Sequence, residues 1–423
     1  MSRECVLNAS QASDLQREFG TPTFVYDQKE LERRCRAALA FPNPYGLTAR
    51  YAMKACPNGA LLKIFNGLGL HIDASSGFEV RRALSAGVPG NQIQLTAQQL
   101  PDDLEELLQK GVIFNACSLN QLREFGRLSN GGRLSIRINP GLGSGHSNRT
   151  NVGGPSSSFG IWHEYLDHAL EIAAQYRLTV DRLHSHIGSG TDPSVWQHCA
   201  RLTLAIAARL PDVISVNLGG GYKVARMPDE EATDLDTAGQ QIVKEFEHFY
   251  ESHGRKLALE IEPGTFFVAN AGALVCTVID VVDTGSSGYH FIKIDAGMTE
   301  VMRPSMYGAQ HPIHVFPRAS KPSAENVDYI VAGHCCESGD VLTPEPDNPE
   351  GLLPRRLLPT QTGDILVIGA TGAYCAGMSA KNYNSFPEAA EVLVANDGTF
   401  HLIRQRQTLE QVTANEKTPD FLQ

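Results

Sequence analysis

Several chemically useful side chains in this 423-residue chain directly follow apolar segments of strand length. Lys54 ends the run Tyr51-Ala52-Met53-Lys54. An amine there is either a solvated loop residue or, if apolar neighbours desolvate it, a group with the lowered pKa that suits Schiff-base formation. His184 and His186 share one face of a strand, but no third ligand has matching spacing, which disfavours a metal site. His186, beside a Gly-Ser turn, fits a ring-stacking residue next to an anion site.

Two further segments supply glycines and a carboxylate. Gly219, Gly220 and Gly221 are consecutive, so that backbone N–H groups can approach a phosphate closely. Glu262, in Glu-Ile-Glu-Pro-Gly, could pair with a protonated ring nitrogen. Each motif alone also has a plain structural explanation, such as a turn. Together, an aldehyde-trapping amine, a ring stacker, a phosphate cradle and a pyridinium partner predict pyridoxal phosphate as cofactor.

Eight strand-length segments that alternate with helix-period segments must position these residues. Such alternation indicates right-handed βαβ units, and eight units in this length predict a (β/α)8 barrel, whose functional residues lie at the carboxyl ends of the strands. No G-x-G-x-x-G follows the first strand, which disfavours a doubly wound sheet. The predicted strands are Thr48–Met53, Leu70–Ala74, Gln92–Thr96, Val112–Ala116, Leu134–Ile138, Arg182–Ile187, Ile214–Leu218 and Leu257–Ile261.

The pattern changes after Thr265. Val, Thr, Gly and Pro dominate, and the apolar period becomes two, which predicts a mostly antiparallel β-barrel or sandwich domain. The strand-like segment Thr21–Asp27 precedes the barrel and could pair with that domain. The sequence therefore predicts an α/β chain with a barrel over 31–265, and a β domain formed by 1–30 together with 266–423.

Composition excludes several classes of protein. The 36 Lys and Arg against 47 Asp and Glu give a net charge of −11, which argues against nucleic-acid and anionic-membrane partners. The sequence contains no run of 18 apolar residues and so predicts no membrane span. Its N-terminal segment has no apolar region typical of a signal peptide. The nine cysteines are odd in number, scattered and without C-x-x-C pairs, which favours reduced thiols in the cytoplasm and no zinc site.

An ordered set of motifs resembles the fold-type III pyridoxal-phosphate decarboxylases, and within them the diaminopimelate decarboxylase family. The resemblance runs from about Phe19 to Gln407. The matching segments are Tyr51–Ala55, Asp73–Glu79, His184–Gly190, Gly219–Gly221, Glu262–Gly264, Arg303–Gly308, Cys336–Asp340, Gly372–Tyr374 and Asn382–Ser385.

The resemblance implies a role for each matched residue. Lys54 would bind the cofactor covalently, and Cys336 would donate a proton to the substrate. The substrate would be meso-2,6-diaminopimelate and the products L-lysine and CO2, in lysine biosynthesis. Family members work as homodimers in which the Cys-Glu segment enters the partner's active site, so a homodimer with shared sites is expected. The implied cofactor-binding residues are Lys54, Asp73, His186, Ser189, Gly220, Gly221, Glu262, Gly264 and Tyr374, and the implied substrate-binding residues are Arg303, Tyr307, Glu337 and Tyr374.

Two positions depart from the family pattern. Thr265 follows Glu-Pro-Gly where the family usually has an Arg that helps bind the distal carboxylate of the substrate. Phe386 follows Asn-Tyr-Asn-Ser where the family again usually has Arg. A threonine cannot supply a charged bidentate donor, so Arg303 and Tyr307 are left to hold that carboxylate, unless another cation such as Arg149 compensates.

Three alternatives therefore stay open. The first is a related decarboxylase of a basic amino acid such as D-lysine, D-ornithine or arginine, which Thr265 motivates and Arg303, Tyr307 and Glu337 disfavour. The second is an amino-acid racemase, which would need a catalytic Tyr in place of Cys336. The third is a non-enzymatic decarboxylase homologue, against which the presence of Lys54 and Cys336 argues.

Overall fold

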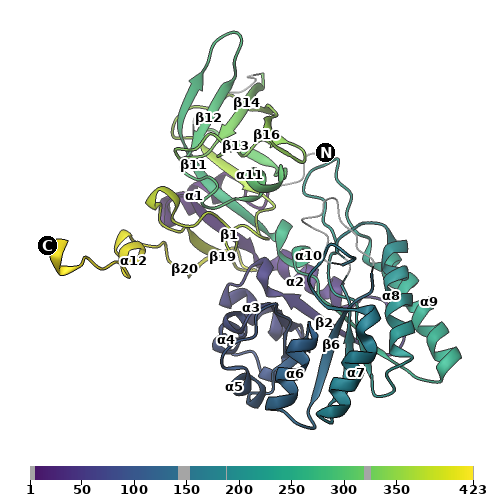
Figure 1. Cartoon of the computed structure of the whole chain (residues 1–423). Coiled ribbons are helices and arrows are strands. Elements are labelled where there is room, and N and C mark those ends of the chain that lie inside the picture. The colour runs from purple at the N-terminus through teal and green to yellow at the C-terminus, as the bar shows by residue number, and fades with distance from the viewer. Residues whose placement is uncertain (1–4, 142–152, 187, 319–324, 423) are drawn as a thin grey trace. The chain divides into compact units, whose positions relative to one another are not determined.

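The computed structural model describes residues 5–141, 153–186, 188–318 and 325–422 (Figure 1). Contacts divide the chain into two compact units, which we call the barrel unit (32–224 and 231–267) and the β unit (1–31, 225–230 and 268–423). The main difference from the predicted boundaries is the short segment 225–230, which packs with the β unit although it lies within the barrel sequence. The domain boundaries themselves stay a prediction.

The barrel unit contains a closed, all-parallel sheet of eight strands, as predicted. Each strand pairs with the next along the chain, and the last strand pairs with the first. Short parallel strands with both faces covered are typical of this architecture. The strands are β2 (Leu47–Ala52), β3 (His71–Ala74), β4 (Ile93–Leu95), β5 (Ile113–Ala116), β6 (Arg133–Asn139), β8 (Thr179–His184), β9 (Ser215–Asn217) and β10 (Ala258–Ile261); the two-residue strand β7 (Ile161–Trp162) pairs with β6.

Helices cover the outside of this barrel (Figure 1). Helix α6 illustrates why the sequence folds this way. The Ser118 side chain accepts a hydrogen bond from the Gln121 N–H and so caps the helix, while Leu122 and Phe125 are buried on one face. The helices are α2 (Gln28–Leu39), α3 (Gly59–Gly67), α4 (Gly77–Ser85), α5 (Leu104–Gln109), α6 (Leu119–Leu128), α7 (Leu166–Gln175), α8 (Pro193–Ala207) and α9 (Leu235–His253).

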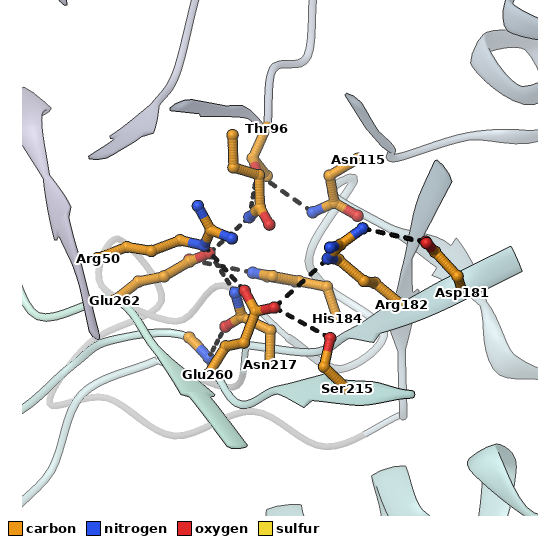
Figure 2. A network of polar contacts seen from close by, with 12 residues as sticks. Arg50, Thr96, Asn115, Asp181, Arg182, His184, Ser215, Asn217, Glu260 and Glu262 are labelled. Atoms are coloured by element: carbon orange, nitrogen blue, oxygen red, sulfur yellow. Dashed lines mark hydrogen bonds and ion pairs between the residues drawn. The ribbon is translucent and has the colours of Figure 1, made fainter. Parts of the chain in front are cut away.

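A buried polar layer lies inside the barrel (Figure 2). Arg50 Nε donates to Glu260 Oε2 at 2.8 Å, and Ser215 Oγ donates to Glu260 Oε1 at 3.0 Å. Arg50 and Glu260 are 1% and 3% exposed, so each charge depends on the other for solvation. The pair links the first barrel strand to the last, two residues before Glu262.

The β unit is built on one sheet whose described strands number nine. Strand β1 (Thr23–Asp27) pairs antiparallel with β11 and parallel with β19, which confirms that the segment before the barrel joins this sheet. Most other pairs are antiparallel, as predicted. The remaining strands are β11 (Gly272–Asp283), β12 (His290–Ile294), β13 (Ile313–Phe316), β14 (Val327–Ala332), β17 (Arg355–Leu357), β18 (Ile365–Gly369), β19 (Ala390–Val394) and β20 (Phe400–Arg404), with a separate hairpin of β15 (Pro344–Glu345) and β16 (Asn348–Leu352).

Valines alternating along these strands form the core of the β unit. Val25, Val275, Val367 and Val392 are fully buried, and Leu15 of α1 (Ala9–Phe19) packs among them. The other helices of the β unit are the short α11 (Arg303–Tyr307) and α12 (Leu409–Thr413), whereas the short α10 (Thr265–Val268) spans the end of the barrel unit. None of the described helices has both the length and the apolar composition that crossing a membrane requires.

Candidate active site

Four predicted cofactor residues lie at the carboxyl ends of barrel strands and influence one another electrostatically. Lys54 follows β2, Asp73 is the penultimate residue of β3, His186 lies two residues beyond β8, and Glu262 follows β10. Burial has the largest influence on the pKa of both Asp73 and His186, and the charges of Lys54 and Glu262 act on both groups as well. The barrel therefore brings these side chains into one electrostatic neighbourhood.

The environment of Lys54 was left open by the sequence, which allowed either a solvated or a desolvated amine. The Lys54 side chain is exposed in the described structure. The reason is local: beyond β2 the backbone forms a short 3-10 turn over Met53–Ala55, in which Met53 and Ala55 are buried and Lys54 points the other way. Within the barrel unit this amine is therefore accessible to solvent and not enclosed by apolar side chains.

Glu262 is a fully hydrogen-bonded buried carboxylate (Figure 2). Its Oε1 accepts from Gln94 Nε2 and from Asn217 Nδ2, both at 2.6 Å, and its Oε2 lies 3.1 Å from His184 Nε2. Burial alone would raise the pKa of Glu262, but the charge and hydrogen bond of His184, together with the Arg50 charge, outweigh burial and lower the pKa to about 2. Glu262 is thus a fixed negative charge, suited to hold a proton on a heterocyclic nitrogen.

Asp73 behaves in the opposite way. Burial and the neighbouring charge of Glu262 raise its pKa to about 8, and its Oδ1 has no hydrogen-bond partner among the described residues. Ionising two carboxyl groups in one buried site costs much more free energy than ionising one of them. Glu262 therefore carries the charge, and Asp73 holds its proton more tightly. The unpaired Oδ1 is available to a bound group.

Only glycine fits at the predicted phosphate-binding positions Gly220 and Gly221. Gly221 has a φ of +92°, and a Cβ there would collide with the Gly188 carbonyl; a Cβ at Gly220 would collide with the Glu262 carbonyl. Gly220 and Gly221 donate none of the hydrogen bonds found among the described residues. Free backbone N–H groups at a bare glycine turn fit a phosphate. Ser189, next to Gly188, is half-buried.

His186 lies directly against this loop. A Cβ at Gly219 would come within 2.5 Å of His186 Nδ1, so the glycine gives the imidazole its space. Burial, with help from the Arg137 and Lys54 charges, lowers the pKa of His186 well below its usual value. A neutral ring whose Nδ1 has no partner among the described residues is suited to stack on a flat cofactor. Gly264 packs against the Ala52 carbonyl at the end of the neighbouring strand β2.

The predicted substrate-binding residues lie in the β unit. Arg303 and Tyr307 are the first and last residues of α11, both half-buried, and Arg303 Nε has no hydrogen-bond partner in the described part of the chain. Tyr374 has a φ of +56°, an unusual backbone conformation for a tyrosine. Two residues earlier, Gly372 lies so near the Val268 carbonyl that no Cβ could fit.

Cys336 and Glu337 are exposed at the tip of an anchored loop. Asp340 fixes the loop, since its Oδ2 accepts from the Cys335 N–H at 2.9 Å and its Oδ1 from the Met298 N–H at 2.7 Å. Asn384 Oδ1 accepts from the Cys336 N–H at 3.0 Å. The two adjacent thiols therefore differ: that of Cys336 faces solvent, whereas burial and the nearby Asp340 raise the pKa of Cys335 to about 12.

The two departures from the family pattern have different structural contexts. Phe386 stacks on the His334 ring, with centroids 3.6 Å apart and planes within 6°, so it packs a ring where an arginine would carry a charge. Thr265 begins the short helix α10 and is half-buried. Arg149, considered as a compensating cation, lies outside the described residues.

Sequence reasoning missed the donors that hold Glu262. Gln94 and Asn217 are buried polar residues in otherwise apolar barrel strands, and their alternation into the barrel interior was the available signal. His184 was considered only as a metal ligand; its Nε2 faces Glu262 instead. No group of three or more His, Cys, Asp or Glu side chains in the described ranges is placed to hold a metal ion.

Comparison with known proteins agrees with this geometry. Residues 28–269 match the family described as "Pyridoxal-dependent decarboxylase, pyridoxal binding domain". The chain is 37% identical to diaminopimelate decarboxylase of Escherichia coli K12, with 98% of each chain covered, and 38% identical to that of Streptomyces coelicolor, with 95% and 90% covered.

Solved structures give the same result. A crystal structure of diaminopimelate decarboxylase has a TM-score of 0.90 at 36% identity, with 97% of both chains covered. The enzyme from M. jannaschii, in co-complex with L-lysine, has a TM-score of 0.86 at 27% identity, with 97% of this chain and 95% of that one covered. The chain therefore belongs to the pyridoxal-dependent decarboxylases, in the diaminopimelate decarboxylase family.

Proposed function

We propose that this protein decarboxylates meso-2,6-diaminopimelate to L-lysine and CO2 with pyridoxal 5'-phosphate as cofactor, as an enzyme of lysine biosynthesis. One observation carries the cofactor: a lysine, a neutral histidine, a bare glycine turn and a fixed carboxylate gather at one end of the barrel. The similarity to diaminopimelate decarboxylases over nearly the whole chain supports the substrate.

We assign the holding of the cofactor to residues of the barrel mouth. Lys54 would bind the aldehyde carbon, His186 would stack on the ring, and Ser189 with the glycine turn would bind the phosphate. Glu262 would keep a proton on the ring nitrogen, because its own low pKa leaves it negatively charged at neutral pH. Asp73, Gly264 and, from the β unit, Tyr374 complete the predicted set.

The reaction needs one electron sink and one proton donor. When bound, pyridoxal phosphate supplies the sink for the electron pair that CO2 leaves behind. Glu262 supports that sink by fixing the positive charge at the ring nitrogen. The thiol of Cys336 gives its proton to the substrate carbon that has lost CO2, and takes a proton back from water afterwards.

Substrate recognition follows from the structure of the two compounds. A meso compound has one D and one L centre, so formation of L-lysine requires loss of the carboxylate at the D centre. The distal L centre keeps its amine and its carboxylate in the product. We assign the distal carboxylate to Arg303 and Tyr307, and the distal amine to Glu337.

A substrate panel tests the function and its main rival, a decarboxylase of a basic amino acid, which Thr265 favours. We expect CO2 release from meso-diaminopimelate to exceed release from L- and D-lysine, L- and D-ornithine and L-arginine. The measurement is kcat/KM on the holoenzyme, with Lys54→Ala protein as the blank. Much faster decarboxylation of any basic amino acid would overturn the proposed substrate.

We propose further that the enzyme is a cytoplasmic homodimer with shared active sites. All nine cysteines are free thiols, which supports a reducing compartment. The exposed position of Cys336 and Glu337 supports a role outside their own chain's barrel, as the family resemblance implies.

Mixing two inactive variants tests the shared site. A heterodimer of Lys54→Ala and Cys336→Ala subunits contains one site with both wild-type residues and one with neither. With random exchange in a symmetric dimer, about one quarter of wild-type activity should return. Exchange is followed independently with differently tagged subunits, and Cys335→Ala mixed with Lys54→Ala serves as a reference. Complete exchange without recovered activity would exclude the shared site.

A further inference from the structure

Arg226 is a buried arginine to which the predicted mechanism gives no role. It lies in segment 225–230, which packs with the β unit, and its side chain is 7% exposed. Its Nε and Nη2 have no hydrogen-bond partner among the described residues. A buried guanidinium with two unused donors is costly unless a ligand completes it.

Hydrogen bonds fix the backbone on both sides of Arg226. The Arg226 N–H donates to Glu230 Oε2 at 2.7 Å, and the Glu230 N–H donates to the Met227 carbonyl at 3.2 Å. On the other side, Asn270 Nδ2 donates to the Ala225 carbonyl at 3.4 Å. Glu230 Oε2 thus accepts from the Arg226 backbone N–H and not from its guanidinium group.

A second unsatisfied arginine lies nearby. Burial, followed by the charge of Arg303, lowers the pKa of Arg226 to about 9, so the two guanidinium groups lie within electrostatic reach of each other. Arg303 Nε is also without a partner in the described part of the chain. Two cations held together with free donors form a binding place for a carboxylate, which can accept from both.

The neighbouring titratable groups offer little negative charge. His311 is neutral: its Nδ1 donates to the Gly369 carbonyl at 3.1 Å, and burial with the two arginine charges lowers its pKa well below the usual value. Burial raises the pKa of the Cys375 thiol to about 11. Glu230 is a carboxylate whose charge acts on Arg226, and it is partly exposed.

We infer that Arg226 is a specificity residue that, with Arg303, binds the distal carboxylate of the substrate and replaces the arginine absent at Thr265. This inference rests on the proposed function, since it takes the distal carboxylate of diaminopimelate as the ligand. Arg226 lies in the segment after the glycine turn, outside the matched family motifs. Its charge would let the chain hold a dicarboxylate substrate with threonine at position 265.

The product and its decarboxylated analogue separate this role from a structural one. L-lysine keeps the distal carboxylate, whereas cadaverine has the same two amines and no carboxylate. In holoenzyme carrying Arg226→Gln, we expect L-lysine to bind about tenfold to a hundredfold more weakly, by titration calorimetry, while cadaverine binding is unchanged. KM for meso-diaminopimelate should rise by a similar factor, with a smaller change in kcat.

Matched variants sharpen the comparison. Arg303→Gln should reproduce the loss of L-lysine binding, and Arg356→Gln, an exposed residue of β17, should leave both ligands unaffected. If Arg226→Gln does not fold, Arg226→Lys keeps a charge but loses the planar fork, and we expect it to weaken L-lysine and not cadaverine.

The outcomes are distinct. Equal weakening of L-lysine and cadaverine, or unchanged KM in a folded Arg226→Gln enzyme, would overturn the inference. Weaker binding of pyridoxal phosphate with unchanged L-lysine affinity would overturn it too, because Arg226 would then serve the phosphate. A wild-type enzyme that does not decarboxylate meso-diaminopimelate would instead refute the proposed function itself.

Discussion

Replacing Lys54 with alanine is expected to abolish decarboxylation and to remove the visible absorbance of the covalently held cofactor. Lys54 is the amine at the end of β2, in electrostatic contact with Asp73 and His186. Its exposure leaves the amine accessible to an aldehyde. Without it, no residue of the predicted set could trap the cofactor covalently.

The measurement combines turnover with spectroscopy. Wild-type holoenzyme should lose its visible band on treatment with borohydride and retain the cofactor covalently, whereas Lys54→Ala should retain none after denaturation. Lys63→Ala provides the matched control, because Lys63 is an exposed lysine on α3, the next helix along the chain. Substantial turnover in Lys54→Ala would refute the assignment of this amine.

The same residue shows what the sequence could and could not predict. Its place at the end of the first barrel strand followed from the apolar run before it, and all eight barrel strands were predicted because parallel strands are short, apolar and regularly spaced. The sixth predicted strand, Arg182–Ile187, was placed too far toward the C-terminus. The observed strand β8 ends at His184, although the sequence after it still has the composition of a strand. Exposure of Lys54 depends on a turn of three residues, which hydrophobic periodicity does not encode.

Polar contacts between segments far apart in the chain could not be predicted from the sequence. Glu262 was assigned its role by resemblance, but its hydrogen bonds come from Gln94, 168 residues away, and from Asn217. Its low pKa depends on His184. Single-sequence patterns describe local structure and give no information on such pairs. Arg226 was missed for the same reason, since only folding places segment 225–230 with the β unit.

Replacing Cys336 with alanine is expected to give the second-largest effect, a slower turnover with the cofactor still bound. Positioned proton transfer typically contributes about 10²–10⁴-fold to rate, so kcat should fall within that range. The spectrum of the holoenzyme should be unchanged, because Cys336 lies in the β unit and not among the residues of the barrel mouth. The measurements are kcat for CO2 release and the visible absorbance of the same samples.

Cys335 supplies the matched control, because the two thiols are adjacent in sequence but differ in environment. Burial and Asp340 raise the pKa of Cys335 to about 12, which makes it a poor acid at neutral pH, and its N–H would still bond to Asp340 in an alanine variant. Cys335→Ala should therefore change kcat much less than Cys336→Ala does. If Cys335→Ala instead proved the more damaging change, the proton donor would be the partly buried thiol, and the exposed position of Cys336 would need another explanation.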